Sequence, residues 1–200
     1  MNPQSAEYVV WAAWGASWLA ASFWASPAAD RPSLRAQFPN LAITAAGFAL
    51  LFALRPTDAS ALLLWRALPI VAWSAVAFSA LGCACCWWAR VHLGALWSGT
   101  VTAKRDHHVV DSGPYGLVRH PIYTGILAAS VGQAVLAGSL NGLAGLALLT
   151  FGFVLKARLE ERFLKSALGA AVYNAYAAHT PMLLPSPWRR RGAHAQDGER

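Results

Sequence analysis

The sequence predicts an all-α integral membrane protein with about five transmembrane helices, including a C-terminal helical hairpin and a cytosolic C-terminal helix. Of its 200 residues, 56% are hydrophobic and only 12% are charged, and the mean hydropathy is +0.39, unlike a soluble domain of this length. The chain also holds four long stretches without Asp, Glu, Lys or Arg. Because roughly 20 helical residues cross a bilayer core of about 30 Å, these stretches indicate membrane spans.

The uncharged stretches give the spans in order. They comprise residues 8–29, 36–54, 67–89 and 121–155. The first is interpreted as a span and not as a signal peptide, because residues 1–7 hold no Lys or Arg and the stretch exceeds the roughly 7 to 15 residues of a signal core. The last is long enough for two helices, and its middle reads AGSLNG, where Gly, Ser and Asn cluster as they do in turns. We therefore divide it into a helical hairpin.

The distribution of basic residues predicts the orientation in the membrane. With five spans, the loops at 30–35 and 90–119 and the C-terminal tail fall on one side and hold two, four and eight Lys and Arg, which is 14 of 16. By the positive-inside rule the N-terminus is outside and the C-terminus is cytoplasmic, as in a bacterial inner-membrane protein. The net charge of +7 is therefore interpreted as a signal of membrane topology and of contact with the membrane surface. Because the basic residues are dispersed along loops, the charge does not favour a nucleic-acid partner.

Nothing in the sequence divides the chain into several domains, since it shows no internal repeat, low-complexity block or linker. We expect residues 1–188 to form one membrane-embedded domain and residues 189–200, RRRGAHAQDGER, to be a disordered basic tail. Residues 156–178 keep apolar residues at helical spacing and are expected to extend the fifth span. No metal is expected, because the three cysteines in the third span lack a matching Cys or His pair: Cys83, Cys85 and Cys86.

The motif GPYGLVRHPIYTG, residues 113–125, brings polar side chains to the start of the predicted hairpin. Glycines allow a ligand to approach the backbone, and Arg119, His120 and Tyr123 supply hydrogen-bond donors. Pro121 suits the first turn of a helix, so the fourth span is expected to begin there. Arg119 and His120 would then lie at a helix N-terminus, where free amides and the helix dipole favour an anionic group such as a carboxylate.

A second polar motif, EERFL, follows at residues 160–164. Glu160 and Glu161 either contribute carboxylates to a site or balance nearby Lys and Arg residues three or four positions away on the same helix. Because adjacent helical residues point about 100° apart, we expect one glutamate to face the site and the other to face a basic neighbour or the surface. The residue types also allow an ordinary explanation of the first motif, with Arg119 snorkelling to the interface and the tyrosines forming part of an interfacial belt.

Taken together, GPYGLVRHPIYTG and EERFLKSALGAAVYNAYAAHTPMLLP, about 40 residues later, resemble the isoprenylcysteine carboxyl methyltransferase family and its bacterial and archaeal relatives over roughly residues 93–185. That family and the related phospholipid methyltransferases bind S-adenosylmethionine where the hairpin meets the C-terminal segment, and a lipid-like substrate enters from the membrane. The resemblance implies a membrane-embedded methyltransferase that acts on a lipid-like or membrane-partitioned carboxylate, amine or thiol.

The resemblance also implies roles for particular residues. Arg119 and Glu161 are the candidate catalytic residues, and Arg119 could bind a carboxylate of the cofactor or the substrate. An amine acceptor would need a general base, whereas a carboxylate or thiolate would not. The candidate bases are His107, His108 and His120. The candidate cofactor-binding residues are Gly113, Pro114, Tyr115, His120, Tyr123, Glu160 and Glu161.

Two other classes of function remain open from the sequence. A small transporter or membrane scaffold could keep the family's shape without a cofactor, although the interiors of the predicted spans lack the charged residues that mark a polar pathway. A reductase-like enzyme would share the hairpin and the C-terminal pattern with some sterol reductase relatives and would use a nicotinamide cofactor. The acceptor and the oligomeric state are left open, because the first three spans match the family only in hydrophobic character.

Overall fold

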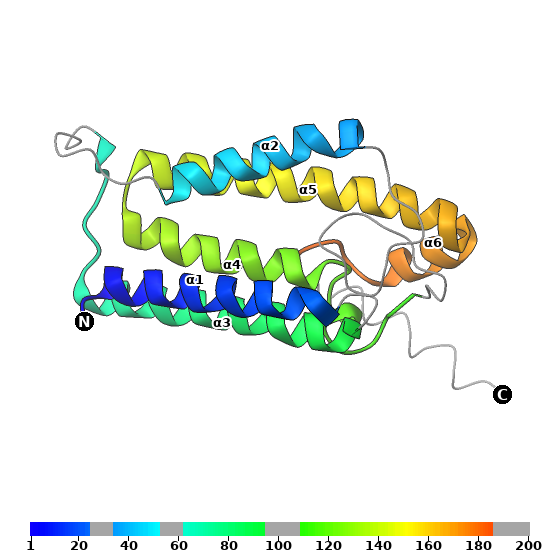
Figure 1. The fold of residues 1–200 in the computed structure, drawn as a ribbon, viewed down its shortest axis with the longest axis horizontal. Coiled ribbons are helices and arrows are strands. Elements are labelled where there is room, and N and C mark those ends of the chain that lie inside the picture. Colours follow the sequence, from blue (N-terminus) through cyan, green and yellow to red (C-terminus); the bar gives the residue numbers. More distant parts are fainter. Residues whose placement is uncertain (25–33, 53–61, 95–108, 186–200) are drawn as a thin grey trace. The chain divides into compact units, whose positions relative to one another are not determined.

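A computed structural model describes residues 1–24, 34–52, 62–94 and 109–185 of the protein, and its regular structure is helical throughout these ranges (Figure 1). The only β pairing among them is one isolated bridge between Leu63 and Ser139. The predicted all-α class is therefore confirmed for the described chain. The predicted tail at 189–200 and two of the three candidate bases, His107 and His108, lie outside the described residues. The elements in order are α1 (Pro3–Ala20), η1 (Ala21–Trp24), α2 (Leu34–Leu51), α3 (Pro69–Leu93), η4 (Gly113–Gly116), α4 (Pro121–Ala137), α5 (Leu140–Leu168) and α6 (Ala170–His179).

Two of these helices are long and apolar enough to cross a membrane, so the expectation of about five spans is met only in part. They are α3, with 25 residues, and α5, with 29. Helix α4 is apolar but has 17 residues, which at about 1.5 Å per residue fall short of a hydrocarbon core of about 30 Å. Helix α1 is not among them, because polar residues in its first two turns, among them Glu7, reduce its mean hydropathy.

The described chain falls into two compact units. The first comprises the described residues within Met1–Phe23, Ser33–Ala84 and Gly125–Lys156, and the second comprises Trp24 and the described residues within Cys85–Thr124 and Ala157–Arg200. In the first unit, glycines allow helices to approach closely. A Cβ atom on Gly82 of α3 would lie 2.6 Å from the carbonyl oxygen of Gly125, and one on Gly145 of α5 would lie 2.5 Å from the backbone nitrogen of Leu51 in α2.

The predicted break in the hairpin is confirmed, because α4 ends at Ala137 and α5 begins at Leu140 (Figure 1). Gly138 makes this turn with a positive φ of 57°. Its carbonyl oxygen accepts hydrogen bonds from the backbone amides of Leu64 and Trp65, at 2.8 and 3.1 Å. The turn therefore also fixes the segment that precedes α3 in the first unit.

Replacing Gly138 with alanine is expected to destabilise the protein by about 2 kcal/mol, because a side chain disfavours a positive φ. The new Cβ would also lie 2.2 Å from the carbonyl oxygen of Trp65. Thermal unfolding in detergent measures the effect. Gly15→Ala in α1 is the matched control, since nothing lies within 4 Å of its Cβ position. Equal melting temperatures for the two variants would contradict this account of the turn.

The second unit contains the C-terminal part of α5, then α6 and the segment that follows it. The predicted helical extension beyond residue 156 is confirmed, with one interruption at Gly169, whose φ of 91° separates α5 from α6. After α6, residues 180–185 run as irregular chain beside the start of α4. These elements surround the polar motifs found in the sequence.

Candidate active site

Helix α4 begins at Pro121, as predicted, and the segment after α6 covers its N-terminus. The backbone amides of Arg119 and His120 donate to the carbonyl oxygens of Pro181 and Met182, at 2.8 and 3.1 Å. The Thr124 hydroxyl donates to the carbonyl of Leu183 at 2.6 Å. The expected position of Arg119 and His120 at the N-terminus of α4 is confirmed, and their own backbone amides are satisfied by carbonyls of the chain; the predicted binding of an anionic group there stays a prediction.

The Glu161 carboxylate binds both polar residues that precede α4. Its Oε1 atom accepts a hydrogen bond from Arg119 Nε at 2.8 Å and lies 3.1 Å from His120 Nε2. The side chains of Arg119, His120 and Glu161 are 9%, 6% and 10% exposed. Charge-assisted hydrogen bonds are short and strong in such surroundings, so this cluster joins α5 firmly to the start of α4.

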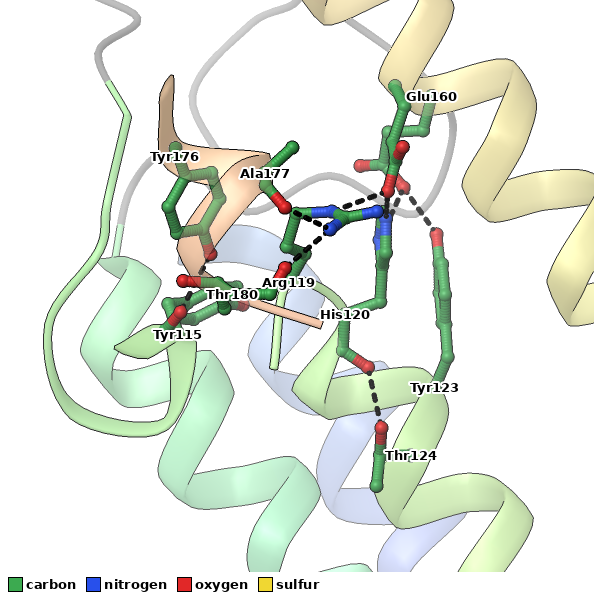
Figure 2. Close-up of polar contacts among 10 residues, drawn as sticks. Tyr115, Arg119, His120, Tyr123, Thr124, Glu160, Tyr176, Ala177 and Thr180 are labelled. Carbon is green, nitrogen blue, oxygen red and sulfur yellow. Dashed lines mark hydrogen bonds and ion pairs between the residues drawn. The ribbon is translucent and has the colours of Figure 1, made fainter. Parts of the chain in front are cut away.

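Arg119 also contacts the C-terminal end of α6. Its Nη1 atom donates to the carbonyl oxygen of Ala177 at 3.2 Å and to that of Thr180 (Figure 2). Two nitrogens of the guanidinium are thus used within the chain, and Arg119 positions α6 and the segment after it. Its predicted role in binding a carboxylate of the cofactor or substrate stays a prediction.

Glu160 approaches the same histidine from the other side. Its Oε2 atom accepts a hydrogen bond from the Tyr123 hydroxyl at 2.8 Å and lies 3.6 Å from His120 Nδ1. The rings of His120 and Tyr123 stack at a centroid distance of 5.3 Å with planes 5° apart. The Glu160 side chain is 30% exposed, so its carboxylate remains accessible to a ligand.

Both glutamates therefore face the site, which contradicts the expectation that only one would. The long Glu side chains converge although their Cα–Cβ directions diverge, because the His120 ring presents one nitrogen to each. The structure does not support the alternative that Glu160 and Glu161 only balance the charge of basic residues on their own helix. The ion pairs of Glu160 and Glu161 in the described chain run to Arg119 and His120, and none runs to Arg158, Arg162 or Lys165.

Two tyrosines of α6 complete the site, and sequence reasoning did not assign them to it. The Tyr176 hydroxyl donates to the carbonyl oxygen of Tyr115 at 2.7 Å, which ties α6 to η4. Tyr173 is buried and meets Tyr176 edge to face. Burial raises the pKa of Tyr115, Tyr173 and Tyr176, so these phenols stay protonated at neutral pH. Tyr173 and Tyr176 are three residues apart on α6, and this spacing was the signal in the sequence that they lie on the same face of the helix.

Tyr176→Phe is expected to cost about 1 kcal/mol of stability, because the carbonyl of Tyr115 loses its donor. Tyr8→Phe is the matched control, since Tyr8 is 41% exposed in the first unit. Melting temperatures in the same detergent measure both changes. A Tyr176 variant as stable as the Tyr8 variant would show that this hydrogen bond does not hold α6 in place.

The predicted pocket residues Gly113, Pro114 and Tyr115 form η4. Gly113 has a φ of 56°, and a Cβ atom there would lie 2.7 Å from the His92 ring. That ring stacks on Tyr115 and bonds to the Ser112 hydroxyl at 2.9 Å. Within the ranges that the structure covers, no three His, Cys, Asp or Glu side chains are grouped to hold a metal ion.

The fold and the site define a helical protein with membrane-length helices, in which a buried Arg–His–Glu cluster lies beside an accessible carboxylate and stacked aromatic rings. Residues 75–166, slightly less than half of the chain, match the model of the isoprenylcysteine carboxyl methyltransferase (ICMT) family. The resemblance inferred from the two motifs is thereby confirmed as far as residue 166, and the match begins within α3, which the sequence had placed outside the resemblance. The matched segment includes His120, Tyr123 and both glutamates, and it ends before α6.

The chain is also similar to the cobalt-zinc-cadmium resistance protein CzcN of Cupriavidus metallidurans. The two are 36% identical over 96 residues, which cover 46% of this chain and 43% of CzcN. The match thus spans less than half the length of this curated relative. Its name describes a biological role and states no reaction.

Proposed function

We propose that the protein is a membrane-embedded methyltransferase that uses S-adenosylmethionine to methylate a lipid-like or membrane-partitioned acceptor. The observation that supports this most directly is Glu160, whose side chain is 30% exposed and whose carboxylate is held beside the stacked rings of His120 and Tyr123. These residues lie within the segment that matches the methyltransferase family.

The chemistry of these residues fits the cofactor. S-adenosylmethionine carries an ammonium group, a sulfonium and ribose hydroxyls, and each of these favours a carboxylate or an aromatic face. Glu160 would hold the ammonium or the ribose, and Tyr123 and His120 would line the same pocket. When bound, the cofactor supplies the electrophilic methyl group.

The chain's own contribution is to position groups and to exclude water. The Arg119–Glu161 pair fixes His120, and the segment at 181–183 covers the N-terminus of α4. In-line methyl transfer depends on such alignment in a closed site. Both ring nitrogens of His120 already face carboxylates, so His120 is better placed to position Glu160 and Glu161 than to accept a proton. A carboxylate or thiolate acceptor would need no general base, whereas an amine would need one other than His120.

We further infer that the protein lies in a bacterial inner membrane with its N-terminus outside and its C-terminus in the cytoplasm. The two membrane-length helices support a membrane location, and the one-sided excess of Lys and Arg, counted for five spans, supports the orientation. The cofactor site would then be cytoplasmic, and the acceptor would reach it from the bilayer.

Transfer of a radiolabelled methyl group tests the reaction. The purified protein in proteoliposomes of total bacterial lipid is incubated with S-adenosylmethionine labelled in the methyl group, and label is counted in the organic extract. We expect extractable label with the wild type and with Ser166→Ala, an exposed change on α5, and little label with Glu160→Gln. Label that stays wholly in the aqueous phase would contradict a lipid-like acceptor. Stabilisation by a nicotinamide cofactor and not by S-adenosylmethionine would favour the reductase alternative.

A further inference from the structure

The C-terminal half of α5 presents a second charged surface that the proposed reaction does not use. Arg158, Arg162 and Lys165 are spaced by four and three residues, which places them within about 60° of one another around the helix axis. Arg158 and Arg162 are exposed, and Lys165 is half-buried. We propose that this basic face binds the phosphate of an anionic phospholipid headgroup. The proposal does not rest on the methyltransferase function.

The described residues of the second unit supply no acidic partner for this face. Glu160 and Glu161 are the acidic residues closest in sequence, but their carboxylates are directed at His120, Arg119 and Tyr123. No ion pair of the described chain involves a residue of the basic face. Three like charges at helical spacing repel one another, so an external anion would relieve the repulsion.

The position of the basic face in the sequence indicates a lipid phosphate as that anion. Helix α5 is one of the two membrane-length helices, and its basic residues follow the uncharged stretch that ends at residue 155. A basic cluster directly beyond an apolar span lies at the level of the headgroups and attracts anionic lipids. Arginine suits this ligand because its planar guanidinium can bind phosphate through two parallel hydrogen bonds.

Lys165 is held in place for this role by α6. Its Nζ atom lies 5.9 Å from the centroid of the Tyr173 ring, and Tyr173 is 3% exposed. A cation over a buried aromatic ring is oriented by it and loses less freedom when it binds a headgroup. The basic face thus combines two exposed arginines with one restrained lysine.

A lipid-dependent melting experiment tests the proposal. The full chain in a neutral detergent is unfolded thermally with added phosphatidylglycerol or with phosphatidylcholine of the same acyl chains. We expect phosphatidylglycerol to raise the melting temperature of the wild type above the phosphatidylcholine value by about 3 °C or more, since a ligand of the folded state stabilises it. Arg158→Gln/Arg162→Gln should lose more than half of this gain. Arg35→Gln/Arg66→Gln, which removes two exposed charges elsewhere, should keep it.

Two results would overturn the proposal. One is an equal gain in the two double variants, which would show that phosphatidylglycerol acts through the general charge of the protein. The other is the same gain with inorganic phosphate, which would indicate a site for free anions. If the glutamine variant does not fold, Arg158→Lys/Arg162→Lys and the single Arg162→Gln replace it. Arg158→Lys/Arg162→Lys should keep most of the gain in melting temperature, and Arg162→Gln should lose part of it. A larger loss in the lysine variant than in Arg162→Gln would refute the assignment.

Discussion

Replacing Glu161 with alanine is expected to reduce the free energy of unfolding by about 3 kcal/mol, the largest loss of stability that we expect from a single site residue. The change removes the partner of Arg119 and His120, whose side chains are 9% and 6% exposed. Breaking a buried ion pair on one side typically costs about 3–5 kcal/mol, because a charge stays buried without compensation. The lower end applies here, since Arg119 keeps its hydrogen bonds to the carbonyls of Ala177 and Thr180.

The control for Glu161→Ala is Arg162→Ala, an exposed change at the next position of α5. Exposed substitutions of this kind usually alter stability by less than about 0.5 kcal/mol. Both variants are unfolded thermally in the same detergent without added lipid. Similar melting temperatures would show that the Arg119–Glu161 pair does not hold the second unit together.

Replacing Glu160 with glutamine is expected to weaken the binding of S-adenosylmethionine at least about tenfold while leaving the melting temperature of the free protein nearly unchanged. The amide keeps an oxygen that can accept the Tyr123 hydrogen bond, but it loses the negative charge that an ammonium group requires. Because the Glu160 side chain is 30% exposed, the fold depends on this charge less than on that of Glu161.

Equilibrium dialysis with labelled cofactor measures the affinity of the Glu160 variant. Tyr123→Phe is the companion variant, since it removes the hydroxyl that orients Glu160 and keeps the carboxylate. We expect a smaller loss of affinity for Tyr123→Phe than for Glu160→Gln. Unchanged affinity in Glu160→Gln would show that the cofactor does not bind at this carboxylate.

Much of the fold was predictable from hydrophobicity and turn residues. The break between α4 and α5 follows from AGSLNG, and the start of α4 follows from Pro121, because Gly and Pro constrain the backbone locally. The number of membrane-crossing helices was less certain, because uncharged length alone does not set how many of those residues become helical. Helix α4 shows the difference, with 17 residues in one arm of a 35-residue stretch.

The candidate site was predictable as a set of residues but not as a geometry. The two motifs contain Arg119, His120, Tyr123 and both glutamates, and in the structure these side chains contact one another. The pairing of the Arg119 amide with Pro181 was not predictable, because a contact between residues 62 positions apart leaves no local pattern. The convergence of both glutamates depends likewise on where the His120 ring lies, which helical periodicity does not determine.

The measurement that tests the central claim most directly is the thermal stability of the detergent-purified wild type with S-adenosylmethionine, with its demethylated product and with a nicotinamide cofactor. A ligand at 100 times its dissociation constant stabilises the folded state by about 2.7 kcal/mol. The proposed site predicts a clear rise in melting temperature with S-adenosylmethionine and with its product, and little or no rise for either ligand in Glu160→Gln. Folded protein whose melting temperature is unchanged by both ligands would contradict the assignment of a methyltransferase site and would favour a scaffold or transporter.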